Sequence, residues 1–144
     1  MEAKKINQFR GKYYFLSNMY PCKVRFENTT YLSSESAFQA SKCKNTGLKK
    51  MFVLLNGREA KKLGRSVTLC DNWDDIKLDI MYRILKSKFS DKELQNKLLS
   101  TGNAELIEGN TWNDAFWGVD LKTGKGENHL GKILMKIRSE LKNN

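Results

Sequence analysis

The sequence predicts an α+β fold that is mostly helical and forms a single domain over residues 1–144. Apolar residues recur at helical spacing in several segments after residue 33, whereas alternating aromatic and β-branched residues are confined to residues 9–31. The chain contains no internal repeat, linker or low-complexity segment. A chain of 144 residues buries roughly two-thirds of its unfolded surface, so one hydrophobic core suffices.

Residues 9–31 predict a small N-terminal β-hairpin or sheet. Aromatic and β-branched residues stand there at alternating positions, namely Tyr13, Phe15, Val24 and Phe26. Glu27 and Asn28 are turn candidates between two strands. Ser17 and Asn18 fall on a connecting loop before the sole proline, Pro21, whose missing N–H does least harm outside a central strand.

The next segment predicts a helix with a polar stripe. Ser33 or Ser34 can cap this helix, which runs to about Lys44. A carboxylate, an amide and an amine stand on one of its faces at i, i+4 and i+7: Glu35, Gln39 and Lys42. Such a face suits a polar cleft. An exposed stripe, on which Glu35 is favoured only by the helix dipole, is the alternative.

Two helices are expected next, and the second is strongly basic. Residues 48–56 predict a helix closed by Gly57, and the run GREAKKLGR predicts a short helix ended by Gly64. The basic helix carries four cations, Arg58, Lys61, Lys62 and Arg65. They are candidates for binding phosphate, although the glycine pattern of a P-loop is absent. A solvated charged face is the alternative.

The C-terminal half predicts three further helices. Asp71 or Asn72 caps the first, the expected core helix, which has the longest apolar stripe: Trp73, Ile76, Ile80, Ile84 and Leu85. Ser90 and Glu93 form a capping box for the second, which ends at residues 101–102. A short strand follows at residues 104–107. The third helix begins at the N-cap candidate Asn128.

Residues 108–128 crowd polar and aromatic side chains into a turn-rich segment. Its first part contains Asn110, Trp112, Asn113, Asp114, Phe116 and Trp117, a mixture that fits neither a strand nor a core helix. Loops of this kind, tied to flanking elements, commonly carry binding and catalytic groups. We therefore expect chemistry in this loop.

Composition narrows the class of protein. A net charge of +10 favours polyanionic partners such as nucleic acid or phosphorylated metabolites, although spread lysines also serve solubility. Three separated cysteines predict neither a disulfide framework nor a metal motif, and the single histidine, His129, makes a zinc site or a Ser-His-Asp triad unfavourable. No apolar run is long enough to span a bilayer and no secretory signal opens the chain, so a soluble, cytoplasmic protein without a membrane partner is expected.

Five motifs occur in a characteristic order: FRGKYYFLSNMYPC, SSESAFQASK, GREAKKLGR, EGNTWNDAFWG and GENHLGKILMKIR. With these motifs the chain resembles the NADAR, or YbiA-like, family over nearly its whole length. The resemblance implies an N-glycosidase that cuts a ribose carbon–nitrogen bond without metal or cofactor. It also implies two substrate classes, ADP-ribosylated guanine and phosphorylated intermediates of riboflavin biosynthesis. Many relatives have Glu-His where this chain has Glu35-Ser36, so no role of that histidine is carried over.

The residues of these motifs suit such a reaction. Positive charge builds on the sugar as the bond breaks, so Glu35 and Asp114 are the candidate catalytic carboxylates. Lys42 is a third catalytic candidate, either as a Schiff-base amine or as a partner of Glu35 or phosphate. Trp112 is a stacking platform or else a core residue, whereas Phe116 and Trp117 are expected in the core.

The predicted substrate-binding residues complete the site. Arg58, Lys61 and Arg65 suit the diphosphate of an ADP-ribosyl group. The polar candidates are Ser17, Asn18, Gln39, Asn110 and Asn128. The leading hypothesis is a hydrolase that removes ADP-ribose from guanine in nucleic acid or nucleotides. A glycosidase of riboflavin intermediates and a catalytically silent binder of ADP-ribose or nucleic acid are the alternatives.

The expected cytoplasmic location is the cytoplasm of the host cell if the protein is viral. The sequence predicts no oligomeric state.

Overall fold

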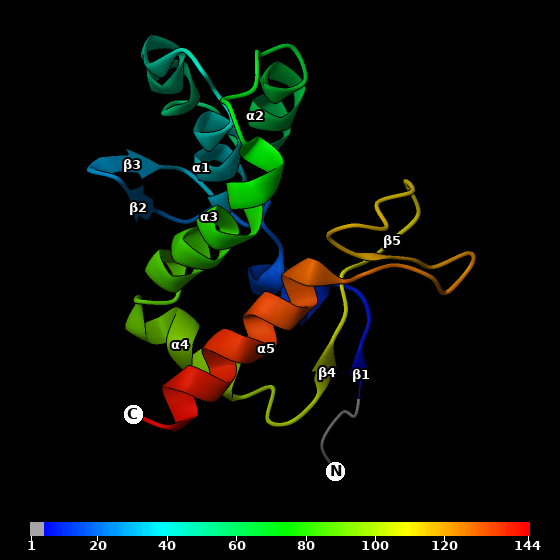
Figure 1. Ribbon diagram of the computed structural model, residues 1–144. Helices are drawn as coiled ribbons and strands as arrows, with labels where there is room; N and C mark the ends of the chain where they lie inside the picture. The colour runs from blue at the N-terminus through cyan, green and yellow to red at the C-terminus, as the bar shows by residue number, and fades with distance from the viewer. Residues whose placement is uncertain (1–4) are drawn as a thin grey trace. The chain divides into compact units, whose positions relative to one another are not determined.

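The computed structural model describes residues 5–144, which form two compact units (Figure 1). One unit contains the residues up to Ser17 together with Asp91–Asn144, and the other contains Asn18–Ser90. Helices dominate both units and the strands are short, which confirms the predicted mostly helical α+β class. The single domain stays a prediction. No helix among the described residues is long and apolar enough to cross a membrane.

The unit Asn18–Ser90 is organised around one buried helix. Its elements are β2 (Val24–Phe26), β3 (Thr29–Tyr31), α1 (Ser34–Ser41), the 3-10 helix η2 (Thr46–Phe52), α2 (Gly57–Gly64) and α3 (Trp73–Lys88). Helix α1 contacts α2, α3, η2 and both strands of the hairpin. Every residue from 34 to 40 is therefore buried, including the polar ones.

The hairpin β2–β3 is the sheet of this unit. Val24 pairs with Tyr31 and Phe26 with Thr29 in antiparallel register. The two turn residues, Glu27 and Asn28, have φ angles of 49° and 64°. Two consecutive left-handed residues make the type I′ turn that matches the twist of a hairpin. The predicted hairpin and its turn are thus confirmed.

The other unit pairs short parallel strands beneath a long helix. Its elements are β1 (Lys5–Ile6), the 3-10 helix η1 (Gly11–Leu16), α4 (Lys92–Leu99), β4 (Glu105–Leu106), β5 (Gly109–Asn110), β6 (Val119–Asp120) and α5 (His129–Lys142). Strand β1 pairs with β4, and β5 pairs with β6. The apolar stripe of α5 packs on α4 and β4 and is buried at Leu130, Leu134 and Ile137.

The strand predicted around Tyr13 and Phe15 is wrong, because these residues lie in η1. Gly11 adopts a left-handed φ of 57°, and the N–H of Tyr13 donates to the carbonyl of Arg10 at 2.9 Å. These local contacts wind the chain into a turn in which the adjacent residues Phe15 and Leu16 are both buried. Burial of neighbours is incompatible with the alternating faces of a strand.

Two predicted helix ends are also wrong. Gly57 begins α2 instead of closing a helix: Asn56 Oδ1 accepts from the N–H of Glu59, and Glu59 Oε1 accepts from the N–H of Asn56, both at 2.9 Å. Residues 46–52 before it form the 3-10 helix η2. Helix α4 is capped by Asp91, whose Oδ2 accepts from the N–H of Leu94 at 2.9 Å, and not by the preceding serine. In both places a short polar side chain next to the predicted boundary satisfies the free N–H groups.

Candidate functional site

The first turn of α1 is fixed by Asn18. The backbone carbonyl of Asn18 accepts from the N–H of Glu35 at 2.9 Å, and Asn18 Oδ1 accepts from Ser34 Oγ at 2.8 Å. Ser33 caps the helix, because its Oγ accepts from the N–H of Ser36 at 3.1 Å. Asn18 Nδ2 faces the sulfur of Met81 at 3.6 Å. Asn18 therefore positions Glu35 through the backbone.

The polar stripe of α1 is buried. Gln39 Nε2 donates to Glu35 Oε2 at 2.6 Å, and the two residues are only 5% and 9% exposed. The solvent-exposed alternative for this stripe is therefore wrong for Glu35 and Gln39. A carboxylate with so little water around it needs such donors, and it acts more strongly on nearby charge than an exposed one.

Helix α2 covers α1 with a face of small residues. Gly57, Ala60 and Gly64 stand at i, i+3 and i+7 and are all buried. A Cβ on Gly64 would overlap Gln39 Oε1, and a Cβ on Gly57 would come within 2.6 Å of Met19 Sδ and 3.4 Å of Glu35 Cβ. Gln39 Oε1 is the buried side-chain oxygen that has no hydrogen-bond partner among the described residues. The two glycines thus allow backbone to approach the Glu35–Gln39 pair directly.

Lys42 completes the stripe as a partly buried amine. Burial lowers the pKa of the Lys42 ammonium below the ordinary value for lysine. The carboxylate of Glu35 opposes this shift, and the charge of Lys61 adds to it. A lowered pKa increases the fraction of neutral amine, which is the form that attacks a carbonyl carbon.

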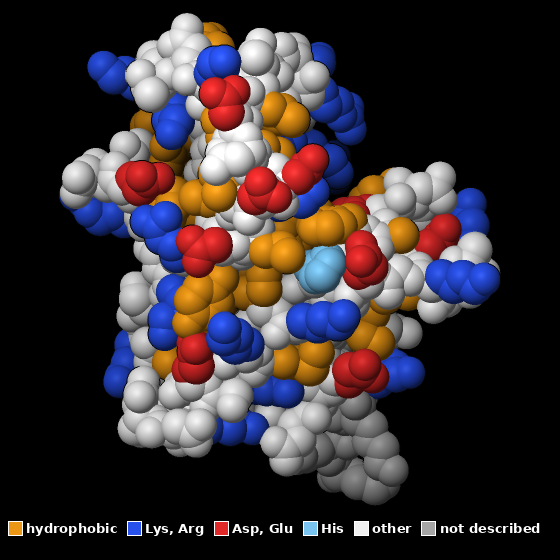
Figure 2. Space-filling model, in the orientation of Figure 1, with side chains coloured by type: hydrophobic (Ala, Val, Ile, Leu, Met, Phe, Trp, Pro, Cys, Tyr) orange, Lys and Arg blue, Asp and Glu red, His pale blue; other side chains and the backbone are white. Residues whose placement is uncertain are grey.

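A cationic face lies on α2 beside its small-residue face. Arg58, Lys62 and Arg65 are exposed and Lys61 is half-buried. Blue side chains gather around η2 and α2 in Figure 2. Because Arg58, Lys61 and Arg65 stand at i, i+3 and i+7, they can approach one anionic group together.

In the other unit, the loop that follows β5 is held by its own polar groups. Asn110 is buried, with 1% of its surface exposed. Its Oδ1 accepts from the N–H groups of Trp112 at 3.3 Å and Asp114 at 3.0 Å. Its Nδ2 donates to the Asp114 carbonyl at 2.8 Å. Asp114 Oδ1 accepts from the N–H groups of Phe116 at 3.2 Å and Trp117 at 2.9 Å. Asn110 therefore positions the backbone of this loop, and its contact with substrate stays a prediction.

The aromatic residues of this loop divide into two groups. Trp112 is 53% exposed, so the core alternative for it is wrong. Phe116 and Trp117 are half-buried and pack edge to face with centroids 4.9 Å apart, and the Phe116 ring lies 4.5 Å from that of His129. Trp112 alone among these three presents much of its indole to solvent.

Asn128 is a second positioning residue. It occupies the N-cap position of α5 with a left-handed φ of 53°, but its side chain does not cap the helix. Its Oδ1 accepts from the N–H of Glu108 at 3.0 Å, and its Nδ2 donates to the Leu106 carbonyl at 2.9 Å. Both polar atoms are thus engaged with backbone, and the contact of Asn128 with substrate stays a prediction.

The first N–H groups of α5 are satisfied by the loop itself. The N–H groups of Asn128, His129 and Leu130 donate to the carbonyls of Gly118, Phe116 and Trp117 at 3.2, 3.2 and 3.0 Å. Backbone carbonyls here take the place that a capping side chain would have.

The predicted site residues are distributed over both units. The unit Asn18–Ser90 brings together the larger group, which consists of Asn18, Glu35, Gln39, Lys42, Arg58, Lys61 and Arg65. The other unit contains Ser17, Asn110, Trp112, Asp114 and Asn128. Ser17 is half-buried at the end of η1, where its N–H donates to the Tyr14 carbonyl at 2.9 Å. Within residues 5–144, no three His, Cys, Asp or Glu side chains are grouped closely enough to hold a metal ion.

Sequence reasoning missed three contributors to the site. Gly57 and Gly64 were expected only as helix ends, and their role depends on what lies across the helix–helix contact. Ser36 was assigned no role from the sequence, and its Oγ donates to the Leu55 carbonyl at 2.7 Å. No local signal marks such contacts, because each joins residues that are distant along the chain.

Comparison with known proteins decides the family. A model of the NADAR domain matches residues 6–142. The chain belongs to the NADAR family. One NADAR relative, N-glycosidase YbiA of Escherichia coli (strain K12), is 36% identical over 129 residues, which cover 87% of this chain and 79% of YbiA. The NMR structure of E. coli YbiA matches with a TM-score of 0.86 and 31% identity, covering 99% of this chain and 88% of that one.

Other relatives are named for riboflavin biosynthesis. A riboflavin biosynthesis protein of Vibrio vulnificus is 38% identical over 131 residues, and the match covers 88% of this chain but 35% of that protein. A chloroplastic riboflavin biosynthesis protein of Zea mays is 40% identical over 90 residues, which cover 58% of this chain and 14% of that protein. The chain thus spans about a third of the Vibrio protein. The predicted enzyme class, a hydrolase of N-glycosyl bonds, is confirmed by its agreement with YbiA.

Proposed function

We propose that this NADAR protein is an N-glycosidase that removes ADP-ribose from guanine in nucleic acid or nucleotides. The observation that carries the proposal is the buried stripe of α1, in which the hydrogen-bonded Glu35 carboxylate lies on the same face as the Lys42 amine. The cationic face of α2 supports a substrate with a diphosphate. Family membership supports the class of bond.

In the proposed reaction, the bond between the sugar carbon and the guanine nitrogen breaks as positive charge develops on the sugar. Glu35 stabilises that charge, and its low exposure strengthens the effect. In the direct route, a water oxygen bonds to the sugar carbon and one water proton goes to the base nitrogen. The products are ADP-ribose and the unmodified guanine, which stays in its strand or nucleotide. Asp114 is the second carboxylate that we assign to charge stabilisation.

Lys42 offers a second route. Its neutral amine adds to the carbon of the opened sugar, guanine leaves with a proton, and the resulting imine is hydrolysed by water to restore the amine. The lowered pKa of Lys42 supports this route, because more of the amine is uncharged near neutrality. Both routes give the same products.

The substrate contacts follow from charge and exposure. Arg58, Lys61 and Arg65 pair with the diphosphate, since charge-assisted hydrogen bonds from guanidinium groups suit phosphate oxygens. Trp112 stacks on a base, a role that suits an indole with 53% of its surface exposed.

A second candidate is an N-glycosidase of phosphorylated riboflavin-biosynthesis intermediates. The names of the Vibrio and maize relatives favour it. The same carboxylate and amine suit its bond, and the same cationic face suits its phosphate. The two candidates therefore differ in substrate and share their chemistry.

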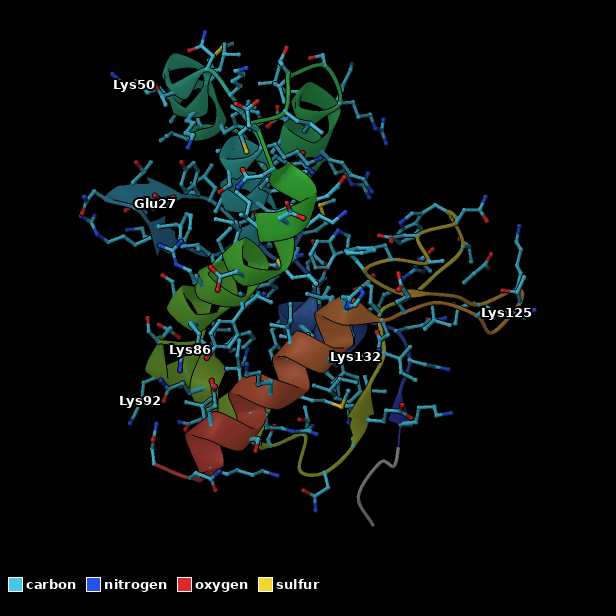
Figure 3. The ribbon with its side chains drawn as sticks, viewed as in Figure 1. Glu27, Lys50, Lys86, Lys92, Lys125 and Lys132 are labelled. Atoms are coloured by element: carbon cyan, nitrogen blue, oxygen red, sulfur yellow. The ribbon has the colours of Figure 1, made fainter. Side chains whose placement is uncertain are left out.

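Product analysis on a panel of substrates separates these functions. The panel contains ADP-ribosylated guanine in single-stranded DNA, the isolated ADP-ribosylated nucleotide, NAD and a phosphorylated riboflavin precursor. We expect release of ADP-ribose from the two guanine substrates, and a loss of about 100-fold in Glu35→Gln. Glu27→Gln, at the exposed hairpin turn labelled in Figure 3, is the matched control and should keep its activity.

Two results would overturn the proposal. Cleavage of the riboflavin precursor alone would assign the metabolic function. Binding of ADP-ribose without cleavage of any substrate would identify a silent binding module.

A further inference from the structure

The end of η2 and the turn that leads from it to α2 expose apolar side chains to an unusual degree. Leu54 is 84% exposed and Met51 is 55% exposed. Both lie in the segment Lys49–Leu55, which we name the Leu54 turn. Apolar residues exposed singly need no explanation, but two of them within one short basic segment point to a contact surface.

The Leu54 turn is held in place next to the candidate catalytic residue. The Leu55 carbonyl accepts from Ser36 Oγ at 2.7 Å, and the Leu55 N–H donates to the Phe52 carbonyl at 3.2 Å. Phe52 is fully buried, and Ser36 directly follows Glu35. Leu54 directly precedes Leu55, and consecutive Cα atoms are about 3.8 Å apart. Leu54 is therefore one residue from the carbonyl that is hydrogen-bonded to Ser36, in the turn of α1 that bears Glu35. The exposure of Leu54 thus occurs in an anchored segment.

The charge around the Leu54 turn is almost entirely positive. Residues 44–65 contain seven Lys and Arg residues and one acidic residue, Glu59. The Glu59 carboxylate caps α2 and is thereby engaged with backbone. Lys50 extends from η2 away from α1 in Figure 3. The Leu54 turn and the cationic face of α2 therefore belong to one continuous basic segment.

We propose that the Leu54 turn contacts the nucleic-acid strand on either side of the modified guanine. This inference rests on the proposed function and specifies its substrate as a polynucleotide. Leu54 and Met51 pack against the bases that flank the guanine, as apolar wedges do where a protein separates stacked bases. Lys49 and Lys50 neutralise the adjacent phosphates.

Several observations favour a nucleic acid over an acidic peptide or an anionic membrane. The basic segment leads into the face of α2 that is assigned to a substrate diphosphate, and its anchor lies beside Glu35. A strand whose modified base reaches Glu35 must continue past the neighbouring surface, and it offers both phosphates and bases there. The Leu54 turn offers a partner for each, with Lys49 and Lys50 for phosphates and the exposed Met51 and Leu54 for bases.

Binding is tested first, without any need for cleavage. The probe is an unmodified, fluorescently labelled single-stranded DNA oligonucleotide, and its anisotropy is measured over a range of salt concentrations. Leu54→Ser should weaken binding by about fivefold. The double variant Lys49→Gln/Lys50→Gln should lower the slope of log affinity against log salt by about 1.4. Leu78→Ser and Lys86→Gln, at exposed positions on α3, are the matched controls and should bind as the parent does.

Cleavage then separates the strand contact from the chemistry. Leu54→Ser and the double lysine variant should lose about fivefold to tenfold in kcat/KM on the modified oligonucleotide and less than about twofold on the isolated ADP-ribosylated nucleotide. Equal losses on both substrates would overturn the inference, as would unchanged binding and cleavage of the oligonucleotide. Loss of binding to phosphatidylserine vesicles in Leu54→Ser, with oligonucleotide binding intact, would assign the turn to a membrane instead.

The two proposals fail in different ways. DNA binding that depends on the Leu54 turn, without release of ADP-ribose, would retain the inferred surface and remove the proposed reaction. Cleavage of the isolated nucleotide, without DNA binding, would retain the reaction and remove the inferred surface.

Discussion

The Asp114 carboxylate has two oxygens with different surroundings. Oδ1 accepts from two backbone N–H groups of its own loop, while no hydrogen bond from the described residues reaches Oδ2. An asparagine keeps the first contact and removes the charge, whereas an alanine removes both. The residue therefore allows loop geometry and charge to be tested separately.

We predict that Asp114→Asn lowers kcat by about 100-fold and leaves the melting temperature close to that of the parent. Asp114→Ala should also lower the free energy of unfolding by about 1–2 kcal/mol, because two N–H groups lose their acceptor. Asp120→Asn, whose Oδ1 likewise accepts from a backbone N–H, is the control. Parent-like turnover in Asp114→Asn would restrict Asp114 to shaping the loop.

Lys42 can be tested by trapping. Borohydride added during turnover should reduce the imine to a stable protein–sugar adduct, detected by mass spectrometry, and Lys42→Arg should abolish it. Since burial lowers the pKa of Lys42, the yield of adduct should rise with pH and reach half its maximum below 10.5, the ordinary value for lysine. Lys44→Arg is the exposed control. Turnover without any adduct would select direct attack by water.

At the scale of elements, the contact between α1 and α2 depends on Gly64. We predict that Gly64→Ala lowers the free energy of unfolding by about 1–3 kcal/mol, because the new methyl group collides with Gln39 Oε1. The displaced amide then no longer holds Glu35, so kcat should fall as well. Urea unfolding and turnover measure the two effects.

Gly47→Ala in η2 is the matched control for this variant. A Cβ at Gly47 would meet only Asn45 Oδ1, at 3.2 Å, so a change below about 1 kcal/mol is expected. Parent-like stability and activity in Gly64→Ala would show that α2 can move away from α1 without consequence.

The elements that the sequence predicted well are those with a periodic pattern. Helical spacing located α3 and α5, and the serine cap located α1. The 3-10 helix η1 was predicted as a strand, and η2 was predicted as a helix with later bounds, residues 48–56, since their burial does not follow the period of a strand or of an α-helix. Gly57 and Gly64 were assigned to helix ends on local grounds, whereas their actual constraint comes from the side chains of another helix.

The candidate site was also predictable where a periodic pattern marks it, and unpredictable where contacts join distant segments. The spacing of Glu35, Gln39 and Lys42 indicated a shared face; in the structure Gln39 donates to Glu35, and Lys42 is the C-cap of the same helix. The backbone contacts of Asn110 and Asn128 could not be predicted, because a buried amide that bonds to backbone has the same sequence signature as one that bonds to a ligand. Only the positions of their partners separate the two cases.

At the scale of the whole molecule, one buried lysine affects stability. Lys88, the last residue of α3, is 1% exposed, and its Nζ lies 5.7 Å from the ring centroid of Tyr20 and 5.3 Å from that of Phe89. Burial lowers the pKa of Lys88 to about 8, and Cys22 opposes this shift. Between pH 8 and 10.5 the unfolded chain binds more protons here than the folded chain, so stability rises with pH across that window.

We predict that Lys88→Met increases the free energy of unfolding at pH 7 by about 2–3 kcal/mol and flattens its rise above pH 8. Methionine fills a similar volume without a charge to bury. Urea unfolding at pH 7 and pH 10 provides the measurement, and Lys86→Met, exposed on the same helix, is the control. A destabilised Lys88→Met protein with an unchanged pH profile would show that the ammonium is stabilised by its surroundings when folded.

The carbonyls of Phe116, Trp117 and Gly118 that receive the first N–H groups of α5 also affect motion. The loop bearing Trp112 cannot swing open on its own, because detaching these carbonyls leaves the helix start without acceptors. Opening of the loop and fraying of the first turn of α5 are therefore one event. Its frequency is governed by the packing of Leu130 and Leu134. Detachment of the C-terminal end of this loop is thus coupled to a helix that carries none of the candidate catalytic residues.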